Sequence, residues 1–360
     1  MDRLSFFKQG LSSVMEAATS LVGIKKAADS FTEAVADALS EVRSSIGLHM
    51  ATLDNEMYNC VETTLERVAE LGFTSIEVGA FYQGKVYLLP PSEFRSLAKR
   101  VGLRITSAYL SKEPTMTPEQ RAAFYAAQDA DKEANEGANK GANEGANEEA
   151  NEEVEVKAEG SVELEAKAAA VSTNATPESQ QKDPDSEWWE RAIATYAQLG
   201  CKYLTLAYQP EGDDERAIEN FVAYVKLISE IATKHELKLC YHPTSVALMP
   251  HDGVSALDKV ASQCDAETLL FEIDTFEAYQ AGAKAEELIK HFGKRIAALH
   301  LHDMENVGDS GNIDFDAVLK QASVNGIDNI YIEVHRFIQP PINCVERSLM
   351  SVETLPNAKF

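Results

Sequence analysis

Ionisable side chains end several short apolar runs in the second half of the chain. Four of these runs each carry one such group at or near the end: His242 in 237–242, Asp274 in 269–274, His300 in 296–302 and Glu333 in 329–334. Imidazole nitrogens and carboxylate oxygens form a mixed ligand set that suits Mn²⁺, Zn²⁺, Co²⁺ or Mg²⁺. If the four run ends meet, they predict a divalent-metal site.

Glu333 lies in an apolar run, where an unpaired carboxylate would be costly to bury. It needs a cation, a hydrogen-bond donor or a raised pKa, and a metal is the simplest partner. Asp274 has a competing role as the N-cap of a following helix. We favour ligation for Asp274, because Thr275 can supply the cap instead.

Further polar groups end or follow the apolar runs and are predicted to contact substrate. They are His49, Glu77, Tyr109, His302 and His335. Glu272 is expected to point outward, between helices.

Positioning these groups requires a scaffold of buried strands. Outside one interruption, eight apolar runs rich in Ile, Leu, Val or Tyr predict strands buried on both faces, at 46–53, 75–80, 103–108, 202–207, 237–242, 269–274, 296–302 and 329–334. Helical patterns separate them, at 58–71, 91–101, 187–199, 215–235, 254–263, 283–292 and 315–325. Five glycines each follow a helix and precede a strand, as helix C-caps do: Gly72, Gly102, Gly200, Gly293 and Gly326.

Strands that alternate with helices predict a parallel sheet, and eight strands are the number that closes a (β/α)₈ TIM barrel. The alternative is an open doubly wound sheet, but the glycine-rich phosphate loop typical of that fold is missing after residue 53. In a barrel, catalytic groups gather at the C-terminal ends of the strands. The candidate residues above occupy those ends.

The barrel is expected over 46–110 and 184–355. Residues 111–183 interrupt it after the third strand, on the active-site side, and contain an acidic tetrapeptide repeat from Ala134 to Glu153. The repeat has no apolar face, so we interpret 111–183 as a disordered, low-complexity insertion. Residues 1–45 predict an N-terminal helical extension; the alternative is a decayed twin-arginine-like export signal, with Leu4 where the second Arg would stand.

The net charge is −25, which argues against binding to nucleic acid through bulk electrostatics. The five cysteines are scattered and form no CxxC pair, so neither a disulfide framework nor a thiolate zinc site is expected. No apolar run is long enough to span a membrane. We expect a cytoplasmic protein, with export to the periplasm as the alternative, and the sequence leaves an oligomer open.

Several motifs in order resemble the xylose-isomerase-like barrel superfamily, and most closely its sugar phosphate isomerase/epimerase family. They are ERVAELGFTSIEVG in the first third of the chain, then LCYHPTS, FEIDTF, ALHLHD, GNIDF and IYIEV. The resemblance covers nearly the whole barrel. It implies a divalent ion held by Glu, Asp, His and Glu from the last four strands, and proton transfer next to a carbonyl through a metal-stabilised enediolate. Asp274, His300 and Glu333 match that set, while His242 stands in place of the fifth-strand Glu.

The resemblance implies a small carbohydrate substrate and a proton transfer by Glu333. For the second acid/base we favour His242, in place of the missing Glu, with His302 and His335 as alternatives. That replacement, with His302 where a Lys is usual, leaves other functions open. One is a lyase or dehydratase acting on a keto-inositol or keto-glycoside. Another is a non-catalytic barrel with a degenerate site. A nuclease related to endonuclease IV is opposed by the acidic charge and the small ligand set.

Overall fold

A computed structural model describes residues 46–128, 130 and 183–358. The N-terminal segment 1–45 and the repeat-containing segment 131–182, on which two of the predictions above fall, lie outside the described residues. Contacts divide the chain into a large unit, Met1–Glu113 with Trp188–Phe360, and a small one, Pro114–Glu187.

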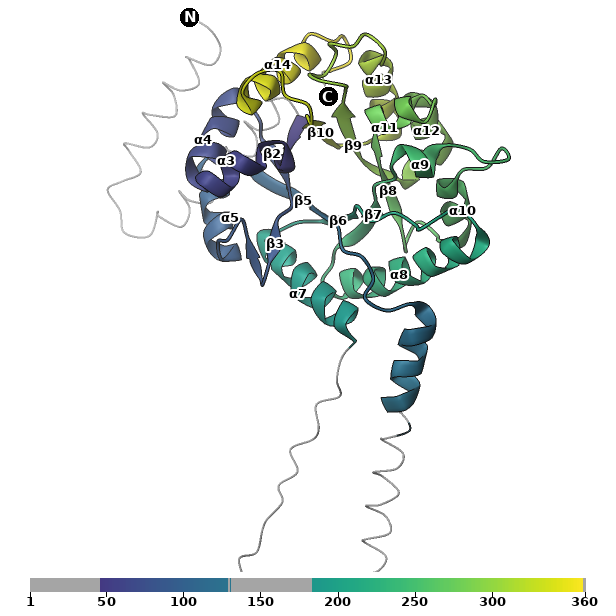
Figure 1. The fold of residues 1–360 in the computed structure, drawn as a ribbon. Coiled ribbons are helices and arrows are strands. Elements are labelled where there is room, and N and C mark those ends of the chain that lie inside the picture. Colours follow the sequence, from purple (N-terminus) through teal and green to yellow (C-terminus); the bar gives the residue numbers. More distant parts are fainter. Residues whose placement is uncertain (1–45, 129, 131–182, 359–360) are drawn as a thin grey trace, which may run out of the picture. The chain divides into compact units, whose positions relative to one another are not determined.

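The large unit is a closed barrel of eight parallel strands in the order β1-β10-β9-β8-β7-β6-β5-β2 (Figure 1). The strands are β1 Ile46–His49, β2 Ser75–Val78, β5 Arg104–Leu110, β6 Tyr203–Leu206, β7 Lys238–Tyr241, β8 Leu270–Asp274, β9 Ile296–His302 and β10 Asn329–Glu333. The last strand pairs with the first, with Gly47 opposite Tyr331. The predicted (β/α)₈ barrel is confirmed, and the open-sheet alternative is excluded.

Helices surround the strands in Figure 1. They are α3 Asp54–Asn59, α4 Val61–Leu71, α5 Pro91–Arg100, α7 Pro184–Leu199, α8 Glu215–Lys234, α9 Ser245–Leu248, α10 Ala256–Gln263, α11 Thr275–Gln280, α12 Ala285–Phe292, α13 Phe315–Asn325 and α14 Pro341–Glu353. Two αβ turns show why glycine follows the helix: Gly72 and Gly326 have φ of 110° and 70°, a left-handed conformation that side chains disfavour. The other three predicted cap glycines also have positive φ.

Some elements differ from the prediction. The strand expected over 46–53 ends at His49 and continues as the 3₁₀ turn Met50–Leu53. The hairpin β3 Phe81–Tyr82 with β4 Lys85–Val86, and the helices α9, α11 and α14, were not predicted.

The small unit includes the first part of the predicted insertion, and this part is not disordered: residues 118–128 are helical. Arg121 lies 3.5 Å from Asp183 and 2.5 Å from Asp185, and Tyr125 donates a hydrogen bond to Asp183 at 2.8 Å. These contacts join the start and the end of the insertion. No helix among the described residues is long and apolar enough to cross a membrane.

Candidate active site

Barrel closure gathers the predicted groups at one end of the sheet. Asp274, His302 and Glu333 are the last residues of β8, β9 and β10, and His242 follows β7 directly. The strand register places Asp274 beside His300 and Glu333 beside His302. All strands are parallel, so these C-terminal ends share the barrel end at which catalytic groups of this fold lie.

His300 is the centre of the cluster and is completely buried. Its Nδ1 lies 2.6 Å from Glu333 Oε2, and its Nε2 lies 2.7 Å from Glu77 Oε2. A third carboxylate oxygen, Glu272 Oε1, is 3.2 Å from the same Nε2. One imidazole therefore faces three buried carboxylates.

These charges control protonation. Burial alone would lower the pKa of His300, but Glu272, Glu333 and Glu77 raise that pKa well above its usual range. Conversely, burial would raise the pKa of Glu77 and Glu333, but His300 and His49 hold both pKa values below their usual range. With no metal bound, the His300 ring is thus an imidazolium, and its two N–H groups donate to Glu333 and Glu77. A metal cation would neutralise the carboxylates equally well.

Glu272 corrects the prediction that it points outward. It is completely buried, and neither of its side-chain oxygens has a hydrogen-bond partner among the described residues. Glu272 is two residues from Asp274 on β8, and residues at that spacing point to the same side of a strand. The spacing was the signal that sequence reasoning missed.

Asp274 caps the helix that follows it and keeps one carboxylate oxygen for the cluster. Its Oδ1 accepts hydrogen bonds from the backbone N–H groups of Phe276 and Glu277, each at 2.7 Å, and so caps α11. The expectation that Thr275 supplies this cap is wrong, since Thr275 Oγ1 donates to the His302 carbonyl at 2.6 Å. The second oxygen, Asp274 Oδ2, remains directed into the cluster.

Four side chains offer a candidate metal centre. One ligand atom from each lies within 4.8 Å of the others in the set His242, Asp274, His300 and Glu333. His242 Nε2 is buried, has no hydrogen-bond partner in the described part of the chain, and is 4.0 Å from Asp274 Oδ2. Unpartnered buried polar atoms beside excess carboxylates are what a missing cation would leave, so these residues fit a divalent ion.

The structure places the predicted substrate contacts around the same centre. His49 Nδ1 lies 2.8 Å from Glu77 Oε2, and the Tyr109 ring packs 4.6 Å from the His49 ring and 5.6 Å from the His300 ring. His302 Nδ1 is 2.9 Å from Asp274 Oδ2, and His335 Nε2 is 2.5 Å from Glu333 Oε1. All nine predicted site residues are therefore close together, although their roles remain predictions.

Gln209 is a supporting residue that sequence reasoning missed. Its side-chain amide donates to the His242 carbonyl at 2.8 Å, and its Oε1 accepts from Tyr241 Oη at 2.6 Å. These bonds fix the turn that carries His242. A lone glutamine in a loop carries no spacing signal, so only the fold identifies it.

The loop after β9 uses its own carboxylate where a ligand anion would bind. Asp303 Oδ2 accepts hydrogen bonds from the backbone N–H groups of Gly308 and Ser310, at 3.1 and 3.2 Å. Asp314 caps α13 by accepting a hydrogen bond from the Ala317 backbone N–H. The main-chain donors at these two positions are thus occupied.

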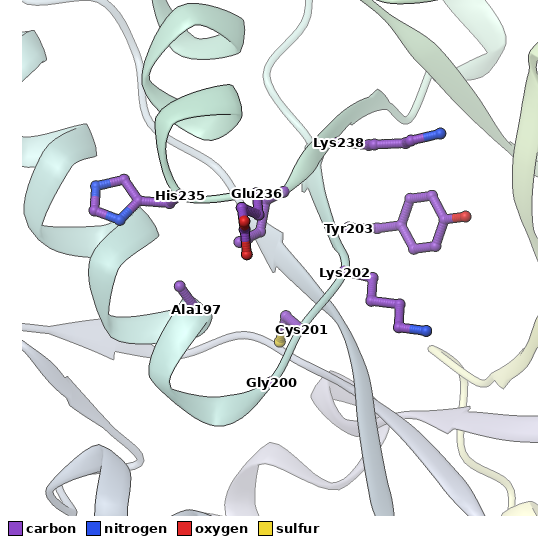
Figure 2. A pocket seen from close by; sticks show the side chains of 9 residues that line it. Ala197, Gly200, Cys201, Lys202, Tyr203, His235, Glu236 and Lys238 are labelled. Carbon is purple, nitrogen blue, oxygen red and sulfur yellow. The ribbon is translucent and has the colours of Figure 1, made fainter.

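A cavity of about 450 Å³ lies at the opposite end of the barrel (Figure 2). Its lining comes from the turns that lead into β6 and β7 and includes Cys201, Lys202 and Lys238. Figure 2 shows Lys202, Tyr203 and Lys238 directed to one side of the turn and His235 to the other. The N-terminal end of a TIM barrel contributes to stability rather than to chemistry, so this cavity is not the active site.

Comparisons with known proteins agree with the barrel fold. The family described as xylose isomerase-like TIM barrel matches residues 149–349, more than half of the chain. A sugar phosphate isomerase/epimerase from Parabacteroides distasonis has a similar structure, with a TM-score of 0.65 and 18% identity over 87% of this chain and 95% of that chain. An L-ribulose 3-epimerase has a TM-score of 0.58 and 13% identity over 87% and 95% of the two chains.

A third similar structure is the 3-keto-D-glucoside 4-epimerase from E. coli, with a TM-score of 0.57 and 12% identity over 87% of this chain and 100% of that chain. No curated protein sequence matches significantly. At these identities the structures establish a shared fold, and the family match establishes kinship. The chain belongs to the xylose isomerase-like TIM barrel family.

Proposed function

We propose that this protein is a divalent-metal-dependent isomerase or epimerase of a sugar or polyol, which moves a proton on a carbon next to a carbonyl. The observation that carries the proposal is the convergence of His242, Asp274, His300 and Glu333 to within 4.8 Å at the C-terminal end of the barrel. The family supports a sugar isomerase or epimerase in general, and the similar structures include epimerases of a ketose and of a keto-glycoside.

The four residues would hold Mn²⁺, Zn²⁺, Co²⁺ or Mg²⁺ through two imidazoles and two carboxylates. When bound, such an ion would polarise a substrate carbonyl and stabilise the enediolate charge that develops as the neighbouring carbon loses its proton. Glu77 would orient the His300 ring by a hydrogen bond, and Glu272 would act on the same ring through its charge.

Glu333 and His242 are the proposed proton carriers. Glu333 has a pKa held below its usual range by His300 and His49 despite its burial, so it is ionised and able to accept a proton. His242 Nε2 has no hydrogen-bond partner among the described residues, and the ring nitrogen of His242 that does not bind the ion would deliver or remove a proton on another side of the substrate. A carboxylate and an imidazole together would replace the two-carboxylate arrangement that the resemblance implies.

The substrate is proposed to carry no phosphate. Asp303 already occupies the Gly308 and Ser310 backbone donors of the loop after β9, where barrels of this type often bind phosphate. Arg336, just beyond β10, lies 3.6 Å from Glu305. A neutral polyol or sugar fits these surroundings better than an anion.

Proton NMR in D₂O tests the function directly. The protein, loaded with Mn²⁺ or Zn²⁺, is incubated with a panel of unphosphorylated ketoses and 3-keto-glycosides and with their phosphates. We expect solvent deuterium at one carbon next to the carbonyl of an unphosphorylated sugar, and a loss of at least about 100-fold in Glu333→Gln and in His242→Gln. His251→Ala, which alters an exposed histidine, is the control that should keep full activity.

The same spectra separate the alternatives. Loss of water from the substrate would identify the lyase or dehydratase function instead. Absence of deuterium incorporation across the panel, with metal bound, would support a non-catalytic barrel.

A further inference from the structure

The two oxygens of Glu333 face different imidazoles. Oε2 lies 2.6 Å from His300 Nδ1, inside the barrel, whereas Oε1 lies 2.5 Å from His335 Nε2. His300 is completely buried, while the His335 side chain is 63% exposed. One oxygen of the Glu333 carboxylate therefore faces the buried cluster and the other faces a solvent-exposed imidazole. A carboxylate that bridges two metal ions is arranged in this way.

His302 lies on the outer side of this carboxylate. Its ring is 4.9 Å from the His335 ring, and its Nδ1 is 2.9 Å from Asp274 Oδ2. A carboxylate that accepts from one ring nitrogen fixes the orientation of the imidazole and leaves the other nitrogen for a metal. One ligand atom each from His302, Glu333 and His335 lies within 4.8 Å of the others.

We propose that His302, His335 and Glu333 form a second divalent-cation site, with Glu333 bridging it to the buried one. The site offers two imidazole nitrogens and one carboxylate oxygen. This set favours Zn²⁺ or Co²⁺ over Mg²⁺, which prefers oxygen ligands. The exposure of His335 lets water or a substrate hydroxyl complete the coordination shell, as in catalytic sites with three protein ligands.

The assignment explains a departure from the family pattern. His302 stands where the resemblance implies a Lys, and it lies two residues after His300 on the same side of β9. His335 follows the end of β10 by two residues. A lysine at 302 would instead place a cationic ammonium there. The second site goes beyond the proposed function. It rests on that function only because both sites use Glu333 as a ligand.

Zinc stoichiometry tests the proposal. The full-length protein is stripped with EDTA, dialysed against buffered Zn²⁺ and measured by elemental analysis and by titration calorimetry. We expect two Zn²⁺ per chain in the unaltered protein, and one in His335→Ala and in His302→Ala. His251→Ala, an exposed histidine near Asp213, should keep two and so controls for adventitious binding.

Co²⁺ gives an independent readout of the bridge. With two Co²⁺ bound, the electron paramagnetic resonance signal should show coupling between the ions, and His335→Ala should give the spectrum of an isolated ion. One Zn²⁺ per chain in both the unaltered protein and His335→Ala would overturn the second site and leave the isomerase proposal standing. Loss of one Zn²⁺ in His251→Ala would also overturn it, and no bound Zn²⁺ at all would overturn both.

Discussion

Replacing His300 by Leu tests the electrostatic core of the site without any metal. The substitution keeps an apolar side chain in the space of the ring, but it removes the cation from Glu77, Glu333 and Glu272. Removing one partner from a buried ionic pair costs about 3–5 kcal/mol, because the remaining charge stays desolvated. For a domain of this size, that loss lowers Tm by roughly 6–20 °C.

The matched control is His242→Leu. His242 is also buried, but its Nε2 has no hydrogen-bond partner within the residues that the structure describes, so replacing it by an apolar group is expected to cost at most about 1 kcal/mol. Both variants are unfolded with urea in EDTA at pH 6 and compared with the unaltered protein. Equal destabilisation by the two substitutions would refute the view that His300 balances the three carboxylates.

The pH dependence of the His300→Leu effect follows from the pKa directions. Glu77 and Glu333 have folded-state pKa values below the usual value, so they stabilise the unaltered protein above about pH 4.3, and this stability is lost as pH falls through the lowered pKa. His300 has a raised folded-state pKa, so its contribution is complete below about pH 6.5 and is lost as pH rises through that raised value. The difference between the two proteins should thus be largest near pH 5–6 and shrink in acid.

Three further predictions concern metal and substrate. Loading with Zn²⁺ at about 100 times its Kd should stabilise the protein by about 2.7 kcal/mol, and EDTA should reverse the gain in a thermal-shift assay; an unchanged Tm would count against a folded-state metal site. His242→Glu, which supplies a third carboxylate, should shift preference from Zn²⁺ toward Mn²⁺ or Mg²⁺ in competition titrations, and an unaltered preference would remove His242 from the ligand set. Asp303→Asn should weaken the hydrogen bonds that residue 303 accepts from the Gly308 and Ser310 N–H groups, and so lower Tm. The variant should still not turn over phosphorylated sugars. Turnover of a sugar phosphate by the unaltered protein would refute the proposal of a neutral substrate.

Periodicity predicted the barrel well, because the strands are short apolar runs and five of the αβ turns carry a glycine at positive φ. Elements without such a signal were missed. The helix α11 has only six residues, so no helical range was predicted there, although Asp274 was weighed as the N-cap of a following helix. The hairpin of β3 and β4 has two residues per strand, which is too short for an alternation pattern.

The site was predictable to the extent that residues at strand ends converge in a closed parallel sheet. Proximity of Asp274, His300 and Glu333 follows from that rule alone. The rule does not predict the hydrogen bonds that His300 makes to both Glu77 and Glu333. Nor does it predict the hydrogen bond from Gln209 to the His242 carbonyl. These depend on side-chain geometry between strands distant in sequence, whereas the misplacement of Glu272 was an error of strand phase that the sequence itself could have corrected.

Anomalous diffraction from crystals grown with saturating Zn²⁺ tests the central claim most directly. The account predicts an anomalous peak at the C-terminal end of the barrel, about 2.0–2.2 Å from an atom of each of His242, Asp274, His300 and Glu333. A map without a peak there, in which His300 keeps its direct contacts to Glu77 and Glu333, would contradict it.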